Sequence, residues 1–180
     1  PGYVVSATIG PDQMVEEPFA DVGAQSMVPV SHILWSHLWL GIATDAFERS
    51  RSFVRAAAKR TPGTTPPSAT KLSEVMGGLQ LLRGEVKAGL ADYVEHFDDS
   101  DWLLTIGAAL RFNNLKIASS EQVARICQGS MSVAGMAGFK NDSPFSVGRH
   151  LRDAMSACLM IANDRIHATN AGLLLIAKEV

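Results

Sequence analysis

Motifs that bind metal ions or carry a catalytic nucleophile are missing from this sequence. The five histidines are scattered and no HExxH or CxxC motif occurs. His32 and His37 are five residues apart, which places them on different faces of a helix. A Ser-His-Asp arrangement stays open, although no G-x-S-x-G turn is present. The sequence therefore predicts no metal site and favours a structural or surface role for each histidine.

The chain also has few cysteines, little net charge and no long apolar run. Cys127 and Cys158 are the only cysteines, and since nothing else indicates secretion we expect both to be reduced core residues. The net charge of −2 gives no electrostatic reason to expect nucleic acid or an anionic membrane as a partner. No signal peptide opens the chain, and no apolar run reaches the roughly 18 residues of a membrane span. We therefore expect a cytoplasmic protein with no membrane span.

Residues 1–30 differ in character from the rest of the chain. They are rich in turn formers, and two strand-like runs occur at residues 3–9 and 19–22. A lone strand cannot satisfy its own backbone, and the chain begins with Pro1 rather than Met. We therefore expect residues 1–30 to be a β-fragment of a longer polypeptide, followed by one domain at residues 31–180.

From about residue 31 onward the apolar residues recur at helical spacing. In a chain that is 47% apolar and 19% charged, this pattern predicts a globular helical domain. The expected helices cover approximately residues 31–59, 67–97, 101–133, 143–161 and 163–178. The predicted fold is mainly α, a four-helix up-down bundle with a short terminal helix, preceded by the short β-fragment.

Three short features carry possible function, and each has a simpler explanation. The acidic residues Asp98, Asp99 and Asp101 could bind a cation, but a helix N-terminus explains them better. The glycine-containing run 135–138 follows a helix rather than a strand, so it is not a dinucleotide fingerprint. The pair formed by Arg152 and the aspartate after it is, taken alone, an ordinary salt bridge.

In order and spacing, these features resemble the C-terminal domain of the acyl-CoA dehydrogenase family. That domain carries a Q-I-F-G-G-x-G-F turn followed by R-D-A, and residues 132–139 and 152–154 match these two motifs. The likeness covers roughly residues 28–178, so residues 1–30 would be the tail of the family's middle β-domain. Residues 143–145 and 149–153 also look like the related flavin monooxygenase branch.

The resemblance implies that FAD is bound across a subunit interface, where the glycine turn of one subunit approaches the cofactor of its neighbour. It assigns cofactor contacts to Arg60, Ser132, Gly135 and Gly138. A guanidinium suits a pyrophosphate because it offers a planar fork of donors, and glycine permits close approach of the backbone. For Arg60, a solvated cation at a helix end is an equally good interpretation.

The catalytic residue stays unknown at this level. Family dehydrogenases carry a glutamate base where this chain has Ile161, and the monooxygenase branch tends to carry a histidine where it has Met160. Some members place the base early in the first helix of the domain, and Asp45 is the first carboxylate there.

The resemblance implies an FAD-dependent oxidoreductase that acts on the CH–CH group of an acyl thioester, presented by CoA or by an acyl carrier. A flavin-dependent monooxygenase on the same scaffold and a non-catalytic partner subunit that completes a flavin site are the alternatives. A further alternative is a helical interaction module that resembles the family only in its architecture. The implied partners are the thioester and further copies of the chain, in a dimer or tetramer.

Overall fold

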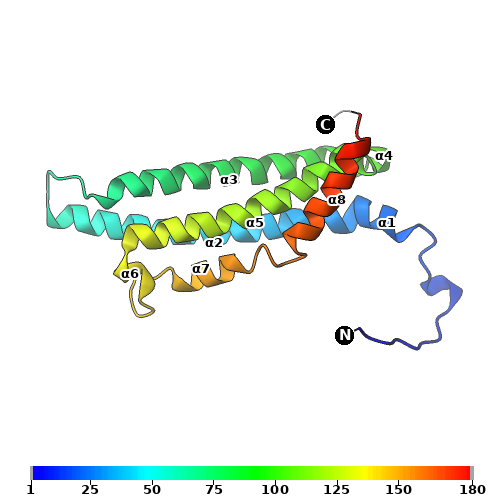
Figure 1. The fold of residues 1–180 in the computed structure, drawn as a ribbon, viewed down its shortest axis with the longest axis horizontal. Coiled ribbons are helices and arrows are strands. Elements are labelled where there is room, and N and C mark those ends of the chain that lie inside the picture. The colour runs from blue at the N-terminus through cyan, green and yellow to red at the C-terminus, as the bar shows by residue number, and fades with distance from the viewer. Residues whose placement is uncertain (1, 179–180) are drawn as a thin grey trace.

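The structure is a computed structural model that describes residues 2–178, and it consists of helices joined by short connections (Figure 1). The described residues contain no β-strand. The helices are α1 (Phe19–Val22), α2 (Val28–Arg60), α3 (Ser68–His96), α4 (Ser100–Leu103), α5 (Ile106–Ala134), α6 (Met136–Phe139), α7 (Gly148–Met155) and α8 (Asn163–Ile176). A 3₁₀ turn at Pro11–Gln13 and a π-helical turn at Gly23–Met27 complete the regular structure. The prediction of a mainly helical domain is confirmed.

Three long helices form the body of the bundle, and α5 packs against both α2 and α3. The helices α2 and α5 run in the same direction and α3 runs in the opposite one, while the short α7 lies beside α2 and α5 (Figure 1). Arg111 of α5 pairs with Glu85 and Asp92 of α3, which ties these two helices together at the surface. The core between the helices is apolar, and its largest members include Trp39, Leu79, Phe112 and Leu115.

The helix expected at residues 101–133 is in fact two helices, α4 and α5. The side chain of Asp99 accepts a hydrogen bond from the backbone N–H of Trp102 at 3.0 Å and caps α4. The Thr105 hydroxyl accepts one from the N–H of Ala108 at 3.1 Å and caps α5. Two caps six residues apart stop one helix and start the next. The capping interpretation of the acidic residues is therefore confirmed at Asp99.

The helix expected at residues 143–161 is much shorter than predicted. Ser143 does cap, because its hydroxyl accepts a hydrogen bond from the N–H of Phe145 at 3.1 Å, but it caps a turn rather than a helix. The helix itself, α7, covers only Gly148–Met155. The last helix, α8, covers Asn163–Ile176, close to the expected range, and no side chain caps its start.

The expected β-fragment is not found among residues 2–178. Residues 2–10 have no regular structure, and their apolar side chains, such as Tyr3 and Val4, lie in solvent. Residues 19–22 form α1, which Pro18 starts, and helical structure then continues through the π turn into α2. A strand requires a partner strand for its backbone groups, and the described residues supply none. The expected domain boundary at residue 30 falls inside α2.

Both cysteines are free thiols. Cys127 is fully buried, and burial raises the pKa of its thiol to about 12, so it is an inert core residue. Cys158 is half-buried, with its sulfur 3.5 Å from the carbonyl oxygen of Ser120. Within residues 2–178, no helix is both long and apolar enough to cross a membrane.

Candidate functional site

The glycine turn predicted from the sequence lies at the end of α5 and leads into α6. Gly135 has φ 56° and ψ −134°, a backbone conformation open essentially only to glycine. A Cβ atom at Gly135 would meet nothing within 4 Å, so its backbone faces open space. At Gly138, by contrast, a Cβ would lie 3.0 Å from the Cβ of Ala134. Gly135 can therefore admit a close ligand, whereas Gly138 is required by packing inside the turn.

Replacement of Gly135 by alanine tests this conformational requirement. We expect Gly135→Ala to lower the free energy of unfolding by about 1–3 kcal/mol, because the new side chain strains the backbone without touching a neighbour. Thermal unfolding followed by circular dichroism measures the loss. Gly172→Ala is a matched control, since that glycine lies in α8 with open space around it, and it should be neutral or slightly stabilising. Equal stability of the two variants would contradict the expectation.

Arg60 and Ser132, the two other residues assigned to a cofactor by the resemblance, are both exposed. Arg60 is the last residue of α2, and Ser132 lies in the last turn of α5. The C-terminal ends of α2 and α5 lie at the same end of the bundle (Figure 1). The Ser132 hydroxyl donates to the carbonyl of Gln128 at 3.0 Å, which leaves its oxygen able only to accept.

This end of the bundle fits a phosphate group in part. Arg60 supplies an exposed cation and Gly135 an accessible backbone, whereas Ser132 has already used its hydrogen and Gly138 is enclosed. The fit therefore rests on Arg60 and Gly135, and one chain provides only one wall of such a site.

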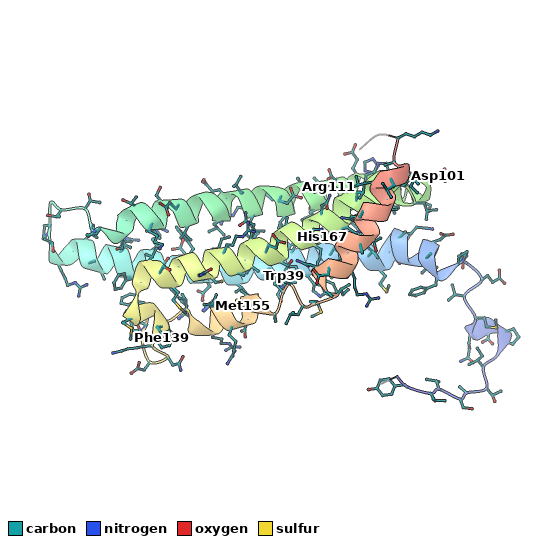
Figure 2. The ribbon with its side chains drawn as sticks, viewed as in Figure 1. Trp39, Asp101, Arg111, Phe139, Met155 and His167 are labelled. Carbon is teal, nitrogen blue, oxygen red and sulfur yellow. The ribbon has the colours of Figure 1, made fainter. Side chains whose placement is uncertain are left out.

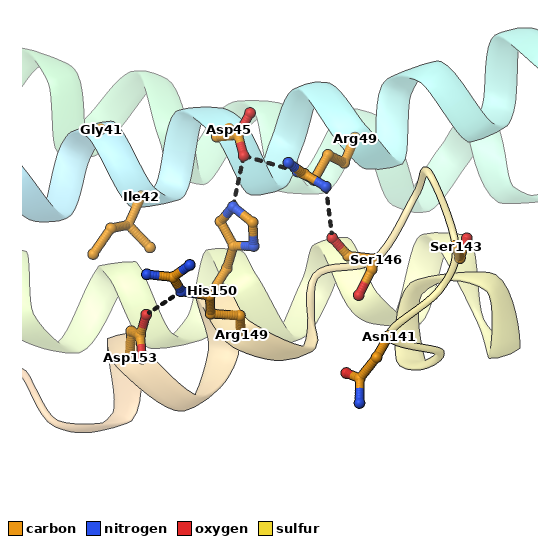
Figure 3. Close-up of a pocket in the computed structure, with 10 residues that line it drawn as sticks. All are labelled: Gly41, Ile42, Asp45, Arg49, Asn141, Ser143, Ser146, Arg149, His150 and Asp153. Atoms are coloured by element: carbon orange, nitrogen blue, oxygen red, sulfur yellow. Dashed lines mark hydrogen bonds and ion pairs between the residues drawn. The ribbon is translucent and has the colours of Figure 1, made fainter.

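A polar cavity of about 690 Å³ lies between α2 and the segment that leads into α7 (Figure 3). Within it, Oδ2 of Asp45 lies 2.6 Å from Nε2 of His150 and 2.8 Å from Nε of Arg49. A guanidinium nitrogen of Arg49 also donates to the carbonyl of Ser146 at 3.3 Å. Asp45 thus joins α7 to α2, and its hydrogen bond with Arg49 and that with His150 lower the pKa of its carboxyl group.

This arrangement has the appearance of a catalytic dyad, but its geometry does not support that role. Nδ1 of His150 is buried, and no residue of 2–178 is within hydrogen-bonding distance of it. A substrate cannot reach this nitrogen, and the other one already contacts Asp45. The Asp45–His150 pair therefore holds α7 in place, and Asp45 is committed to it rather than available as a base.

A mostly apolar groove of about 660 Å³ lies near the start of α2, at the other end of the bundle from the glycine turn. Its walls come from α1, the π turn, the first part of α2, α5, and the stretch from Ile161 into α8. Apolar side chains line most of it: Phe19, Met27, Val28, Trp35, Ile161, Ile166 and Leu173. Polar groups come from His32, Asn113, Arg165 and Thr169, so the groove suits a molecule with a long apolar part and a polar end.

His32 of α2 lies in the wall of this groove. It is only 3% exposed, and its Nδ1 lies 3.1 Å from the carbonyl oxygen of Phe112. Burial lowers the pKa of His32, the hydrogen bond to the carbonyl of Phe112 opposes this, and the charge of Lys116 also lowers the pKa. Sequence reasoning gave His32 a structural role, because its partner is 80 residues away and nothing local marks it.

Beside the groove, Ile161 and Ala162 have positive φ angles of 53° and 34°. Such angles are strained for residues with a Cβ, and most of all for a β-branched one. Asn163 anchors the turn, since its Oδ1 accepts a hydrogen bond from Nζ of Lys116 at 2.6 Å and its Nδ2 donates to Ser120 at 3.1 Å. Ile161 thereby forms part of the groove wall.

Comparison with known proteins adds no assignment to these sites. A scan against protein-family models, a search of curated proteins and a search of solved structures each found no match. Among the described residues, no three His, Cys, Asp or Glu side chains gather closely enough to hold a metal ion.

Proposed function

We propose that this chain is the C-terminal helical part of an FAD-dependent oxidoreductase of the acyl-CoA dehydrogenase type, with a four-helix up-down bundle in which α7 is the short fourth helix. The observation that carries the proposal is the groove beside the start of α2. Its volume of about 660 Å³, its apolar walls and its few polar groups suit the acyl chain of a thioester. Apolar walls would bind the chain, and polar groups would fix the orientation of the thioester end.

The separation of the groove from the glycine turn supports an oligomer. The two sites lie at opposite ends of the bundle (Figure 1), and α2, with 33 residues, is about 50 Å long. A single chain therefore cannot bring its own glycine turn to a flavin beside its own groove. In a dimer or tetramer, Arg60 and Gly135 would hold the pyrophosphate of the neighbour's cofactor, whose isoalloxazine ring would accept a hydride from the bound acyl chain.

One observation favours a second candidate, a flavin-dependent monooxygenase on the same scaffold. None of the groove-lining residues that the structure describes carries a carboxylate, and the position of the family's glutamate is Ile161. A monooxygenase needs no base for an α-proton, so it is compatible with this wall. The same observation suits a subunit that completes the flavin site of a catalytic partner.

The visible absorbance spectrum of the full-length protein separates these possibilities. Under anaerobic conditions, we expect flavin bands that bleach when acyl-CoAs of several chain lengths are added, because hydride transfer reduces the flavin. Flavin bands that persist with every acyl-CoA would contradict the dehydrogenase and favour the monooxygenase or the partner subunit. A protein without flavin would contradict the proposal as a whole.

A further inference from the structure

We infer that His32 is the general base of the groove, and that its Nε2 atom accepts the proton that a bound substrate loses. This inference rests on the proposed function, to which it adds the catalytic group that the sequence does not reveal. Three independent observations support it: the tautomer of the ring, the place of Nε2 and the charges around it.

The hydrogen bond to Phe112 fixes the tautomer of the His32 ring. A carbonyl oxygen can only accept a hydrogen bond, so the Nδ1 atom 3.1 Å away from it must carry the hydrogen. In the neutral ring, Nε2 is then the nitrogen with the free lone pair. The ring of Trp35, with its centroid 6.0 Å from that of His32, helps to hold this orientation.

The Nε2 atom has the access that a base needs. His32 lines the groove, and within residues 2–178 the structure gives Nε2 no hydrogen-bond partner. It also differs from Nδ1 of His150, which is sealed from solvent. Of the two histidines in cavities, His32 is therefore the one that a ligand can reach.

The surroundings keep His32 in its unprotonated form. Lys116 of α5 is a cation whose charge acts on the ring, and Arg165 of α8 is a second cation in the groove lining. Burial of the ring and the charge of Lys116 disfavour the imidazolium ion, so at neutral pH the ring is ready to accept a proton.

The bond between hydrogen and the carbon next to the thioester carbonyl breaks, and its proton moves to Nε2 of His32. The electron pair left on that carbon forms the new carbon–carbon double bond. A flavin bound beside the groove would supply the oxidant: it would accept the hydride of the next carbon, which oxidises the thioester by two electrons and reduces the flavin by two.

The substitution His32→Asn tests the inference while preserving the local structure. The amide nitrogen of asparagine lies where Nδ1 lies and can still donate to the Phe112 carbonyl, but no atom replaces Nε2. The matched control is His37→Asn, because His37 lies on the same helix, is exposed, and bonds only to the carbonyl of Ile33 through Nδ1 at 2.9 Å.

In the full-length flavoprotein, we expect His32→Asn to slow anaerobic flavin reduction by butyryl-CoA by about 100-fold or more, with little change in the Kd for butyryl-CoA. His37→Asn should reduce the rate by less than 2-fold. A reduction rate within about 5-fold of the wild type in His32→Asn would overturn the inference. A wild type whose flavin is not reduced by any acyl-CoA would instead overturn the proposed function, and the role of His32 with it.

A second measurement reports on His32 without any turnover. Nitrogen-15 NMR of the chain with labelled histidine should show a hydrogen on Nδ1 and a lone pair on Nε2 at pH 7, and the ring should titrate below the usual pKa of about 6.5. The reduction rate should fall at low pH along the same titration curve. A hydrogen found on Nε2, or a ring charged at pH 7, would overturn the assignment of His32 as the base even in an active dehydrogenase.

Discussion

Replacement of Phe112 by alanine is expected to lower the free energy of unfolding by about 3–5 kcal/mol. Phe112 is 2% exposed, and it lies where α3, α4 and α5 meet. Tyr93 and Trp102 meet its ring edge-on, with centroids 6.1 and 6.2 Å away. The substitution leaves a cavity that these rigid aromatic rings cannot fill by a small movement, so both the transfer energy and the contacts are lost.

Urea unfolding of Phe112→Ala and of Phe139→Ala checks this expectation. Phe139, in α6, is 64% exposed, so its truncation removes the same side chain from a surface position and should change stability by less than about 0.5 kcal/mol. Figure 2 shows Phe139 at the end of the bundle. A loss of less than 1 kcal/mol for Phe112→Ala would show that the aromatic cluster is loosely packed.

The helices were predictable from the sequence because their apolar spacing is a local property. The stripe on α2 and that on α3 continue for about eight turns each, and both helices were located to within a few residues. The predicted structure was in error where one side-chain hydrogen bond ends a helix, or where a segment has no partner strand among the described residues. Thr105 has the residue type of a cap, but the apolar pattern runs through it, and only its hydrogen bond to Ala108 reveals the break.

The groove was not predictable, because its parts are distant in the sequence. His32 and Phe112 are 80 residues apart, and Lys116 and Asn163 are 47 apart. The turn at Ile161 and Ala162 was not predictable from the sequence either, since positive φ angles usually occur at glycine and neither residue is glycine. The glycine turn at Gly135 was located correctly, because there glycine and the unusual φ angle coincide.

Replacement of Asn163 by alanine is expected to lower the free energy of unfolding by about 3 kcal/mol. Lys116 is 0% exposed, and burial lowers the pKa of its amine. Besides Asn163, its Nζ contacts the carbonyl of Ala157 at 3.3 Å and lies 5.7 Å from the centre of the Trp39 ring. Without the amide of Asn163, a buried ammonium group loses its shortest hydrogen bond and no carboxylate compensates for it.

The charge of Lys116 is the proposed cause, and two comparisons test it. In the double variant Asn163→Ala/Lys116→Met, the charge is gone and an apolar chain of similar length replaces it, so most of the lost stability should return. Alkaline pH should likewise restore part of the lost stability of the single variant Asn163→Ala, because it removes the charge of Lys116. Since the folded-state pKa of Lys116 lies below the unfolded value of about 10.5, the native state loses its proton first. Stability should therefore rise as the pH increases toward 10.

Denaturant unfolding at pH 7 and at pH 9.5, for the wild type, Asn163→Ala, Lys116→Met and the double variant, measures both effects. If Lys116→Met fails to restore Asn163→Ala, the loss comes from the strained turn itself rather than from the buried charge. The two explanations have different consequences for the groove. Relief of strain would let Ile161 leave the groove wall, whereas loss of a charge partner would leave the turn in place and weaken only the contact between α5 and α8. Binding of butyryl-CoA to the rescued double variant then distinguishes a groove shaped by Asn163 from one that is merely stabilised by it.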